Sequence, residues 1–393
     1  MSTASPVGAG LDRLAPRAQA SVNVAAIARN CARLGSELRA GTQLCAVVKA
    51  DGYGHGAVQS ARAALEGGAG WLAVASAQEA CELRAAGLER APILVMGALR
   101  PGELAEALAA SADVVVWSEQ HVREVAAAGG GRVHVKLDSG MGRLGTRDAG
   151  LASRVLELAE QSAGVEPVGL MTHFATADEL DDDGFFAQQL DSFARWAGEL
   201  KATRPELIVH AANSAAMLRE QGAQFDMVRC GIAIYGMDPF GVDPAERALE
   251  PALELSSYVA EVKLCRAGES AGYGRRFVAE RDTWLGVLPI GYGDGWRRGL
   301  SNNAEVLIDG ARRALVGTVS MDNVTIDLGA EASAERLRGA PAVLIGAQGS
   351  ERITAEEVAR RLETINYEIS CDLTPRVPRV YHRDGVALEP VHG

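Results

Sequence analysis

The sequence predicts an α/β fold in which a (β/α)8 barrel of the TIM type is followed by a mostly-β domain. Two patterns support this prediction. Eight short apolar runs alternate with helix-forming stretches between residues 44 and 236. Beyond about Met237 the pattern changes to short segments in which polar and apolar residues alternate.

The eight apolar runs are typical of parallel strands that are buried on both faces, because they are apolar throughout. In order they are LCAVVK from Leu44, WLAVAS from Trp71, ILVMG from Ile93, DVVVW from Asp113, VHVKLD from Val133, PVGLMTHF from Pro167, IVHAAN from Ile208 and MVRCGIAIYG from Met227. The stretches between them, such as 76–86 and 102–110, carry helix formers with apolar residues three and four positions apart.

An open, doubly wound sheet is the competing arrangement, and the number of strands alone does not exclude it. Its dinucleotide-binding form is disfavoured. The turn after the first run reads DGYGHG from Asp51, which is not the G-x-G-x-x-G pattern, and no acidic residue closes the next run.

The C-terminal third is expected to form antiparallel strands. Pro239, Pro244 and Pro251 mark a linker, and alternating segments follow as SYVAEVKL from Ser257 and TVSMDNVTIDL from Thr318. One helix is expected near 355–362. We therefore divide the chain into an N-terminal tail that can add a strand to the β domain (1–23), the barrel (24–245) and the mostly-β domain (246–393).

Composition narrows the class of protein. The net charge of −12 argues against nucleic acid and anionic membranes as partners, since both bind basic surfaces. The six scattered cysteines include no C-x-x-C pair, which is typical of reduced thiols in a cytosolic protein. The N-terminus lacks the apolar stretch of a secretory signal, and no run approaches the roughly 20 apolar residues of a membrane helix. We expect a cytoplasmic protein.

Reactive residue types gather where the predicted strands end, which is where barrel enzymes place their chemistry. In order along the chain they are Lys49, Asp138 leading to Arg143, His173, Asn213 with Ser214, and Arg229 followed by Gly231 and Ile232. The set contains no serine with its own base and no pair of carboxylates, so it does not indicate hydrolysis.

Each of these residues alone is better explained as a solvated loop residue or a hydrogen-bonded core residue. Together they favour another chemistry. An apolar barrel mouth would lower the pKa of Lys49 and favour a nucleophilic amine. Hydroxyl and glycine residues after the last two strands suit a phosphate monoester held by backbone N–H groups. Lysine, phosphate cradle and arginine together indicate pyridoxal 5'-phosphate (PLP).

We expect no metal site. The acidic segment 179–184 is faintly similar to a calcium-binding loop, but the position that requires a bidentate glutamate is Leu190. A solvated acidic loop explains the segment better.

The sequence closely resembles the alanine racemase family of fold-type III PLP enzymes across residues 20–385. Nine pieces in family order carry the resemblance: AVVKADGYGHG around Lys49, HVKLDSGMGRLG around Arg143, MTHFATAD around His173, AANSAA around Ser214, VRCGIAIYG around Arg229, SAGYGRRF around Tyr273, IGYGDG around Tyr292, GTVSMDN around Met321 and TINYEISC around Tyr367.

The resemblance implies the roles of the cofactor-binding residues. Lys49 binds PLP covalently, Arg229 faces the pyridine nitrogen, His173 lies near the ring, and Arg143 contacts the phenolic oxygen. Lys136 matches a lysine that is carbamylated in some members, where it positions that arginine. The implied contacts to the phosphate end are Tyr53, Asn213, Ser214, the amides of Gly231 and Ile232, and Tyr367.

The resemblance also implies a substrate side and a homodimer. Met321, Asp322 and Tyr292, together with Arg143, are expected near the substrate carboxylate. Tyr273 is expected to be the second base, delivered by the partner subunit. Racemisation removes a proton from one face of the α-carbon and returns it on the other, so Lys49 and Tyr273 suit the two faces.

The function implied is interconversion of L- and D-alanine, supplying D-alanine for cell-wall precursors. Departures from the family pattern are small: Asn323 stands where glutamine is frequent, and Trp296–Arg297 where an aromatic–proline pair is common. A serine or broad-specificity racemase is the nearest alternative. A non-catalytic PLP-binding carrier and an amino-acid decarboxylase are alternatives from other classes.

Overall fold

The computed structural model describes residues 16–181 and 183–388. Residues 1–15, which make up most of the predicted N-terminal tail, lie outside the described residues, as does Asp182 of the predicted acidic loop. The chain forms two compact units. Among the described residues, the barrel unit comprises 21–181, 183–253, 354–372 and 381–388, and the β unit comprises 16–20, 254–353 and 373–380.

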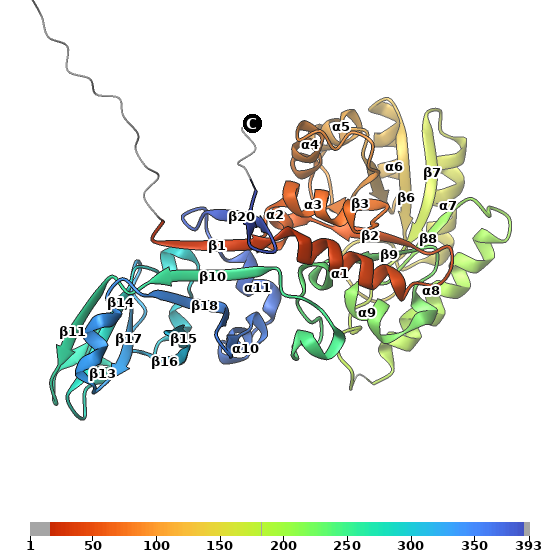
Figure 1. The fold of residues 1–393 in the computed structure, drawn as a ribbon. Coiled ribbons are helices and arrows are strands. Elements are labelled where there is room, and N and C mark those ends of the chain that lie inside the picture. The colour runs from red at the N-terminus through yellow and green to blue at the C-terminus, as the bar shows by residue number, and fades with distance from the viewer. Residues whose placement is uncertain (1–15, 182, 389–393) are drawn as a thin grey trace, which may run out of the picture. The chain divides into compact units, whose positions relative to one another are not determined.

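The barrel unit is built around a closed barrel of eight parallel strands, which confirms the predicted (β/α)8 architecture (Figure 1). The strands are β2 (Gln43–Val47), β3 (Trp71–Val74), β4 (Ile93–Val95), β5 (Asp113–Val116), β6 (Gly131–Lys136), β7 (Val165–Met171), β8 (Ile208–His210) and β9 (Met227–Cys230). Each corresponds to one of the eight apolar runs, and β9 pairs with β2 to close the barrel.

Helices follow the strands. They are α1 (Val24–Ser36) before the barrel, the short left-handed turn α2 (Lys49–Tyr53), α3 (Ala57–Glu66), α4 (Ala77–Ala85), α5 (Pro101–Ala109), α6 (Glu119–Ala127), α7 (Ala149–Gln161), α8 (Phe185–Lys201) and α9 (Ser214–Arg219). The predicted helices at 76–86 and 102–110 correspond to α4 and α5. Ser76 starts α4 with a capping box in which its hydroxyl accepts from Glu79 N–H and the Glu79 carboxylate accepts from Ser76 N–H.

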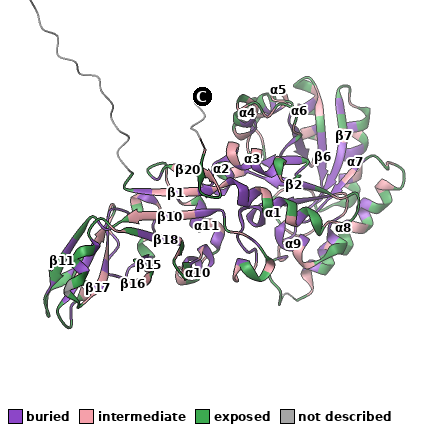
Figure 2. Cartoon of the chain, in the orientation of Figure 1, coloured by how far each residue is buried: buried purple, intermediate pink, exposed green. Residues whose placement is uncertain are grey.

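Burial on both faces explains why polar and apolar residues do not alternate along these strands. All residues of β3, β4 and β5 are buried, with one face of each strand filling the barrel and the other covered by helices (Figure 2). The helices bury one side only. In α1, for example, Ile27, Cys31 and Leu34 are spaced by four and three residues and are fully buried.

The β unit contains an antiparallel sheet in the order β11-β14-β17-β16-β15-β18-β10-β1, with β19 paired to β18. Its strands are β1 (Ala18–Asn23, shared with the barrel unit), β10 (Leu253–Tyr258), β11 (Glu261–Cys265), β14 (Thr283–Leu288), β15 (Glu305–Ile308), β16 (Ala311–Val316), β17 (Val324–Gly329), β18 (Pro341–Gln348) and β19 (Glu351–Ile353). A separate hairpin joins β12 (Ser270–Ala271) to β13 (Phe277–Val278).

One expected strand is half as long as predicted. The alternating segment from Thr318 is extended in the sheet only as β17, and residues 318–323 form a loop. The backbone groups of this loop are used elsewhere: the carbonyl of Ser320 accepts from Tyr292 N–H, and that of Met321 accepts from Gly293 N–H. These contacts replace the sheet hydrogen bonds that the alternation predicts.

The predicted helix near 355–362 is α10 (Ala355–Arg361), and it is followed by α11 (Asn366–Cys371). Both belong to the barrel unit by their contacts, whereas the sequence ranges placed them with the β domain. The hairpin of β20 (Arg379–Arg383) and β21 (Val386–Ala387) ends the described chain. The domain boundaries drawn from the sequence stay a prediction.

No helix in 16–181 or 183–388 combines the length and apolar character needed to cross a bilayer. All six cysteines have free thiols.

We predict that Gly54 is required for the packing of α11 against the turn that follows β2. Gly54 has a φ of +80°, and a Cβ there would overlap the carbonyl oxygen of Ser370 in α11. Gly68 is the matched control, because it has a φ of +95° and open space around its Cβ position. Gly68→Ala should cost about 1–2 kcal/mol from backbone strain alone. Gly54→Ala should lower the free energy of unfolding by a further ~1–3 kcal/mol from the overlap. Urea denaturation measures both, and equal losses would contradict the close approach.

Candidate active site

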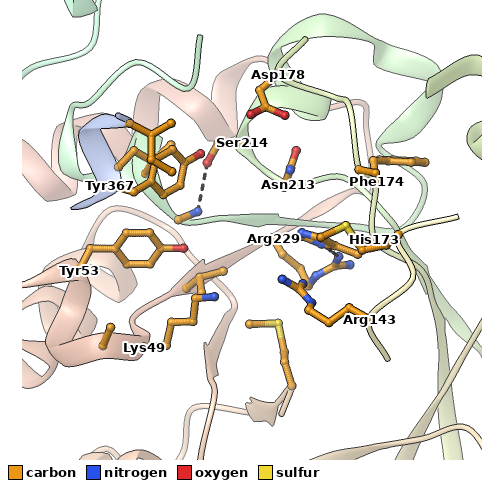
Figure 3. Close-up of a pocket in the computed structure, with 18 of the residues that line it drawn as sticks. Lys49, Tyr53, Arg143, His173, Phe174, Asp178, Asn213, Ser214, Arg229 and Tyr367 are labelled. Atoms are coloured by element: carbon orange, nitrogen blue, oxygen red, sulfur yellow. Dashed lines mark hydrogen bonds between the residues drawn. The ribbon is translucent and has the colours of Figure 1, made fainter. Parts of the chain in front are cut away.

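A pocket of about 420 Å³ opens at the end of the barrel where the strands finish (Figure 3). Every lining residue belongs to the barrel unit. Lys49 and Tyr53 lie on one side of the pocket, and Arg143, His173 and Arg229 lie on the other. The predicted residues that line it are Lys49, Tyr53, Arg143, His173, Asn213, Ser214, Arg229, Gly231, Ile232 and Tyr367.

Lys49 enters the pocket because the chain turns sharply after β2. Ala50, Asp51 and Gly52 all adopt left-handed φ values of 53°, 51° and 60°. The strained turn is held from outside: Ala50 N–H donates to the Glu79 carboxylate at 2.7 Å, and the Asp51 carboxylate accepts from Ala57 N–H at 2.9 Å. Strain of this kind persists only where the surrounding contacts fix it.

The environment of Lys49 favours the neutral amine. Burial lowers the pKa of Lys49, and the nearby positive charge of Arg143 lowers it further. The described residues give the Lys49 ammonium no ion-pair or hydrogen-bond partner. Desolvation and a neighbouring cation are two ways in which proteins make a lysine amine more nucleophilic.

Arg229 lies almost fully buried on β9, with 3% of its surface exposed. Its guanidinium donates to the carbonyls of Thr172 at 2.9 Å and Ala211 at 3.0 Å, and to His173 Nδ1 at 3.2 Å. Burial lowers the pKa of Arg229 to about 10, so the side chain stays cationic near neutrality.

His173 is neutral. Burial, followed by the charge of Arg229, holds the pKa of His173 well below its ordinary value. Because Nδ1 accepts from Arg229, the single ring proton is on Nε2. His173 and Arg229 are thus joined by a direct hydrogen bond.

The other end of the pocket is a cradle of hydroxyl and amide groups. The Ser214 hydroxyl accepts from the N–H groups of Gly231 at 3.1 Å and Ala233 at 3.4 Å. Gly231 is required because a Cβ there would overlap the hydroxyl of Tyr53. Ile232 begins a 3-10 turn, and the first N–H groups of such a turn have no acceptor within it.

Two phenols complete this end. The rings of Tyr53 and Tyr367 lie 6.0 Å apart, and Tyr53 also packs on Tyr235 at 5.2 Å. Burial raises the pKa of both Tyr53 and Tyr367, so both are neutral hydrogen-bond donors. The cradle thus offers several donors to an anionic group.

Arg143 reaches the pocket from the loop after β6. Asp138 shapes this loop, because its carboxylate accepts from Gly140 N–H and Gly142 N–H at 3.0 Å each. Lys136 is buried just before the loop, and burial followed by the charge of Arg229 lowers its pKa to about 8. Two arginines, Arg143 and Arg229, therefore line a pocket in which Asp178 is the one carboxylate among the described lining residues.

The remaining predicted residues belong to the β unit: Tyr273, Tyr292, Met321 and Asp322. Their loops are held together by the carbonyl contacts described above and by the Thr318 hydroxyl, which donates to the Tyr273 carbonyl at 2.7 Å. The side chain of Asp322 pairs with Arg376 at 2.5 Å. Tyr273 is 75% exposed, so its phenol is open to a binding partner.

The sequence did not predict a site role for several other lining residues: Val47, Ala50, Met96, Met141, Asp178, Ile365 and Cys371. Two signals could have found some of them. Asp178 lies within the MTHFATAD segment that contains His173, and Ile365 and Cys371 lie within the segment that contains Tyr367. Met96 follows the third barrel strand, but an apolar residue there carries no distinguishing signal.

The fold and the pocket define a barrel enzyme with a partly buried lysine of lowered pKa in the pocket at the ends of its strands. Comparison with known proteins specifies the family. The model of the alanine racemase N-terminal domain matches residues 22–239, and that of the alanine racemase C-terminal domain matches residues 252–381.

Individual relatives agree. The chain is 43% identical to the alanine racemase of Geobacillus stearothermophilus over 376 residues, covering 94% of this chain and 95% of the relative. It is 40% identical to alanine racemase 1 of Bacillus subtilis over 380 residues, covering 94% of each. The crystal structure of the Bacillus anthracis alanine racemase with bound L-Ala-P superposes with a TM-score of 0.87 at 37% identity, covering 96% of this chain and 97% of that one.

The chain belongs to the alanine racemase family, which confirms the resemblance seen in the sequence, and it is an isomerase.

We predict that Arg143 contributes to the lowered pKa of Lys49. Arg143→Gln removes a positive charge near the amine, so the ammonium should persist to higher pH and the pKa of Lys49 should rise. Arg143→Lys keeps the charge and should keep most of the shift. Acetylation of the cofactor-free protein as a function of pH, followed by mass spectrometry of the Lys49 peptide, measures the titration. Lys263, exposed on β11, is the reference peptide in the same digest. An unchanged titration midpoint in Arg143→Gln would contradict the electrostatic contribution.

Proposed function

We propose that this protein interconverts L- and D-alanine with PLP held in the barrel pocket by Lys49. The observation that carries the proposal is the convergence of a desolvated lysine, a cradle of neutral donors and two arginines on one pocket. The names of the relatives support alanine as the substrate.

The pocket residues fit PLP. The Ser214 hydroxyl, the Gly231 and Ile232 amides and the phenols of Tyr53 and Tyr367 suit the phosphate, and Asn213 starts the helix beside them. The space that Gly231 leaves beside Tyr53 lets the backbone approach a phosphate closely. Lys49 would hold the aldehyde carbon, Arg143 the phenolic oxygen and Arg229 the pyridine nitrogen.

When bound, PLP supplies an electron sink that stabilises negative charge at the substrate α-carbon. The residue at the pyridine nitrogen sets how strong that sink is. Arg229 keeps its proton because its pKa of about 10 exceeds neutral pH, so it does not protonate the nitrogen as a carboxylic acid would. A weaker sink limits the lifetime of the negative charge and the side reactions that follow from it.

Two bases on opposite faces of the α-carbon account for racemisation. The neutral Lys49 amine takes or returns the proton on one face. We propose that the Tyr273 phenol does so on the other face, that it comes from a second copy of the chain, and that the enzyme is a homodimer. Its exposure of 75% supports a partner-facing role. The His173 Nε2–H is a suitable donor to a phenolate at that position.

The substrate carboxylate would lie near Arg143, Tyr292, Met321 and Asp322. A biosynthetic role in supplying D-alanine for the cell wall and a cytoplasmic location remain predictions, as does the absence of nucleic-acid and membrane partners. A racemase for serine or several amino acids is the alternative from the same class, and a PLP-binding carrier without catalysis is the alternative from another.

A panel of L-amino acids scored for the D-enantiomer tests the function. Alanine should be racemised fastest. Lys49→Arg should lose at least about 10²-fold in rate because it removes a catalytic base. Lys263→Arg, on the exposed face of β11, should keep full activity. Racemisation of serine or basic amino acids without alanine would overturn the substrate. Cofactor binding without any racemisation would favour the carrier.

Tyr273→Phe tests the second base. Removing the phenolic hydroxyl should slow exchange of the α-proton with D₂O unequally for L- and D-alanine, since each enantiomer presents its proton to a different base. Tyr258→Phe is the matched control, because Tyr258 is also an exposed tyrosine of the β unit. Equal and undiminished exchange rates for both enantiomers would rule out the role.

Mixing two inactive variants tests the homodimer. If Tyr273 serves the partner's pocket, subunits carrying Lys49→Arg and subunits carrying Tyr273→Phe should form hybrid dimers with one intact site, and activity should return. If mixing restores no activity after subunit exchange has been verified, the proposal that two subunits share each active site is wrong.

A further inference from the structure

A chain of hydrogen bonds runs through the buried interior of the barrel, from the start of β5 to the pocket. Arg229 Nη1 lies 2.8 Å from His210 Nδ1, His210 Nε2 lies 2.8 Å from His134 Nδ1, and His134 Nε2 lies 3.2 Å from the Asp113 carboxylate. Both histidines are fully buried, and Asp113 is 4% exposed.

Counting protons fixes the state of both histidines. The three links need one proton each. Arg229 supplies one and an ionised Asp113 supplies none, so the two imidazoles together supply two. If His134 carried two protons, its Nδ1–H would point at His210 Nε2, and His210 would have to accept at both nitrogens. A neutral imidazole cannot do this. Both rings are therefore neutral, with the proton on Nε2.

The pKa directions of Asp113 and His210 agree with an ionised carboxylate and a neutral His210. Burial raises the pKa of Asp113, but the hydrogen bonds from His134 and Arg132 outweigh it and leave the pKa below its usual value. Burial, then the charge of Arg229, holds the pKa of His210 well below its ordinary range. Arg132 Nε lies 3.0 Å from Asp113 and anchors the carboxylate where β5 and β6 begin.

The barrel is shaped to hold this chain. Gly169 of β7 pairs in register with His134, and a Cβ at Gly169 would overlap the His134 ring. Trp71 packs edge-on against His134 with ring centroids 5.8 Å apart. The two histidine rings meet edge to face at 4.9 Å. These contacts leave the His134 ring little freedom to turn.

We propose that Asp113 is a positioning residue for Arg229. Its carboxylate accepts a hydrogen bond from His134 Nε2–H, which fixes the tautomers of His134 and His210. His210 therefore presents an unprotonated Nδ1 to the arginine. Without that acceptor, the His134 N–H is buried and unpaired, and the rings must rearrange to satisfy it. The kinetic consequence rests on the proposed function, because Arg229 then orients at the cofactor nitrogen.

The tautomers can be observed directly. In protein with ¹⁵N-labelled histidine and no substrate, His134 and His210 should each show one protonated Nε2 and one unprotonated Nδ1 throughout neutral pH. Variants of each histidine assign the signals among the seven histidines of the sequence. An imidazolium signature for either ring, or a protonated His210 Nδ1, would overturn the proposal. This readout is independent of any reaction, so it does not fail if the proposed function fails.

Two variants at one position separate positioning from folding. Asp113→Leu has a similar shape and no acceptor, so the His210 signals should become a mixture of tautomers. In PLP-loaded enzyme, kcat for alanine should fall by roughly 10- to 100-fold, with a smaller change in KM. Asp113→Asn keeps an oxygen that can accept the hydrogen bond from His134 Nε2–H. It should therefore keep the original tautomers of His134 and His210 and most of kcat.

If Asp113→Leu keeps both the tautomers and kcat, Asp113 does not position Arg229. If Asp113→Asn and Asp113→Leu lower kcat equally, the negative charge of Asp113 matters and its role as a hydrogen-bond acceptor does not. That result also contradicts the proposal. Gly169→Ala provides a second route should Asp113→Leu fail to fold, because it displaces the His134 ring while every charge remains. Gly169→Ala should disturb the ¹⁵N signals of His210 in the same way. Unchanged signals would contradict the proposed hydrogen-bond chain.

Discussion

The buried guanidinium of Arg229 is the constraint on which the rest of the site depends. Moving a charge out of water is costly unless hydrogen bonds or an opposite charge replace the lost hydration. Among the described residues Arg229 has no carboxylate partner. It is satisfied instead by the carbonyls of Thr172 and Ala211 and by two neutral histidines. Its charge is therefore solvated by dipoles and remains available to the pocket.

The buried charge of Arg229 also affects the pKa values of neighbouring side chains. The Arg229 charge lowers the pKa of His173, Lys136 and Lys49, although burial is the larger cause for each. A net positive pocket and a lysine of lowered pKa follow together, which suits an anionic cofactor and an amine nucleophile. The long buried chain to Asp113 places one balancing carboxylate at the opposite end of the barrel, where it does not cancel the charge that the pocket uses.

Much of the fold could be predicted because barrel strands are buried on both faces and read as apolar runs. Lys49 and His173 were then predicted as site residues because they stand where predicted strands end. The chain through His134 and His210 could not be predicted, because it depends on the register between strands, such as His134 opposite Gly169. The loop at 318–323 was misread as strand because alternation does not reveal that its carbonyls bind residues 292–293. The left-handed turn after Lys49 likewise has no local signature at Ala50 and Asp51.

The most direct test of the account is to ask which lysine holds the cofactor. The sequence has four lysines, Lys49, Lys136, Lys201 and Lys263, so the answer is unambiguous. Borohydride reduction of the PLP-loaded protein, followed by digestion and mass spectrometry, fixes the cofactor to the lysine that bound it. The account predicts one pyridoxyl group per chain, on the Lys49 peptide. A label on Lys136, Lys201 or Lys263 instead, or no label at all, would contradict it.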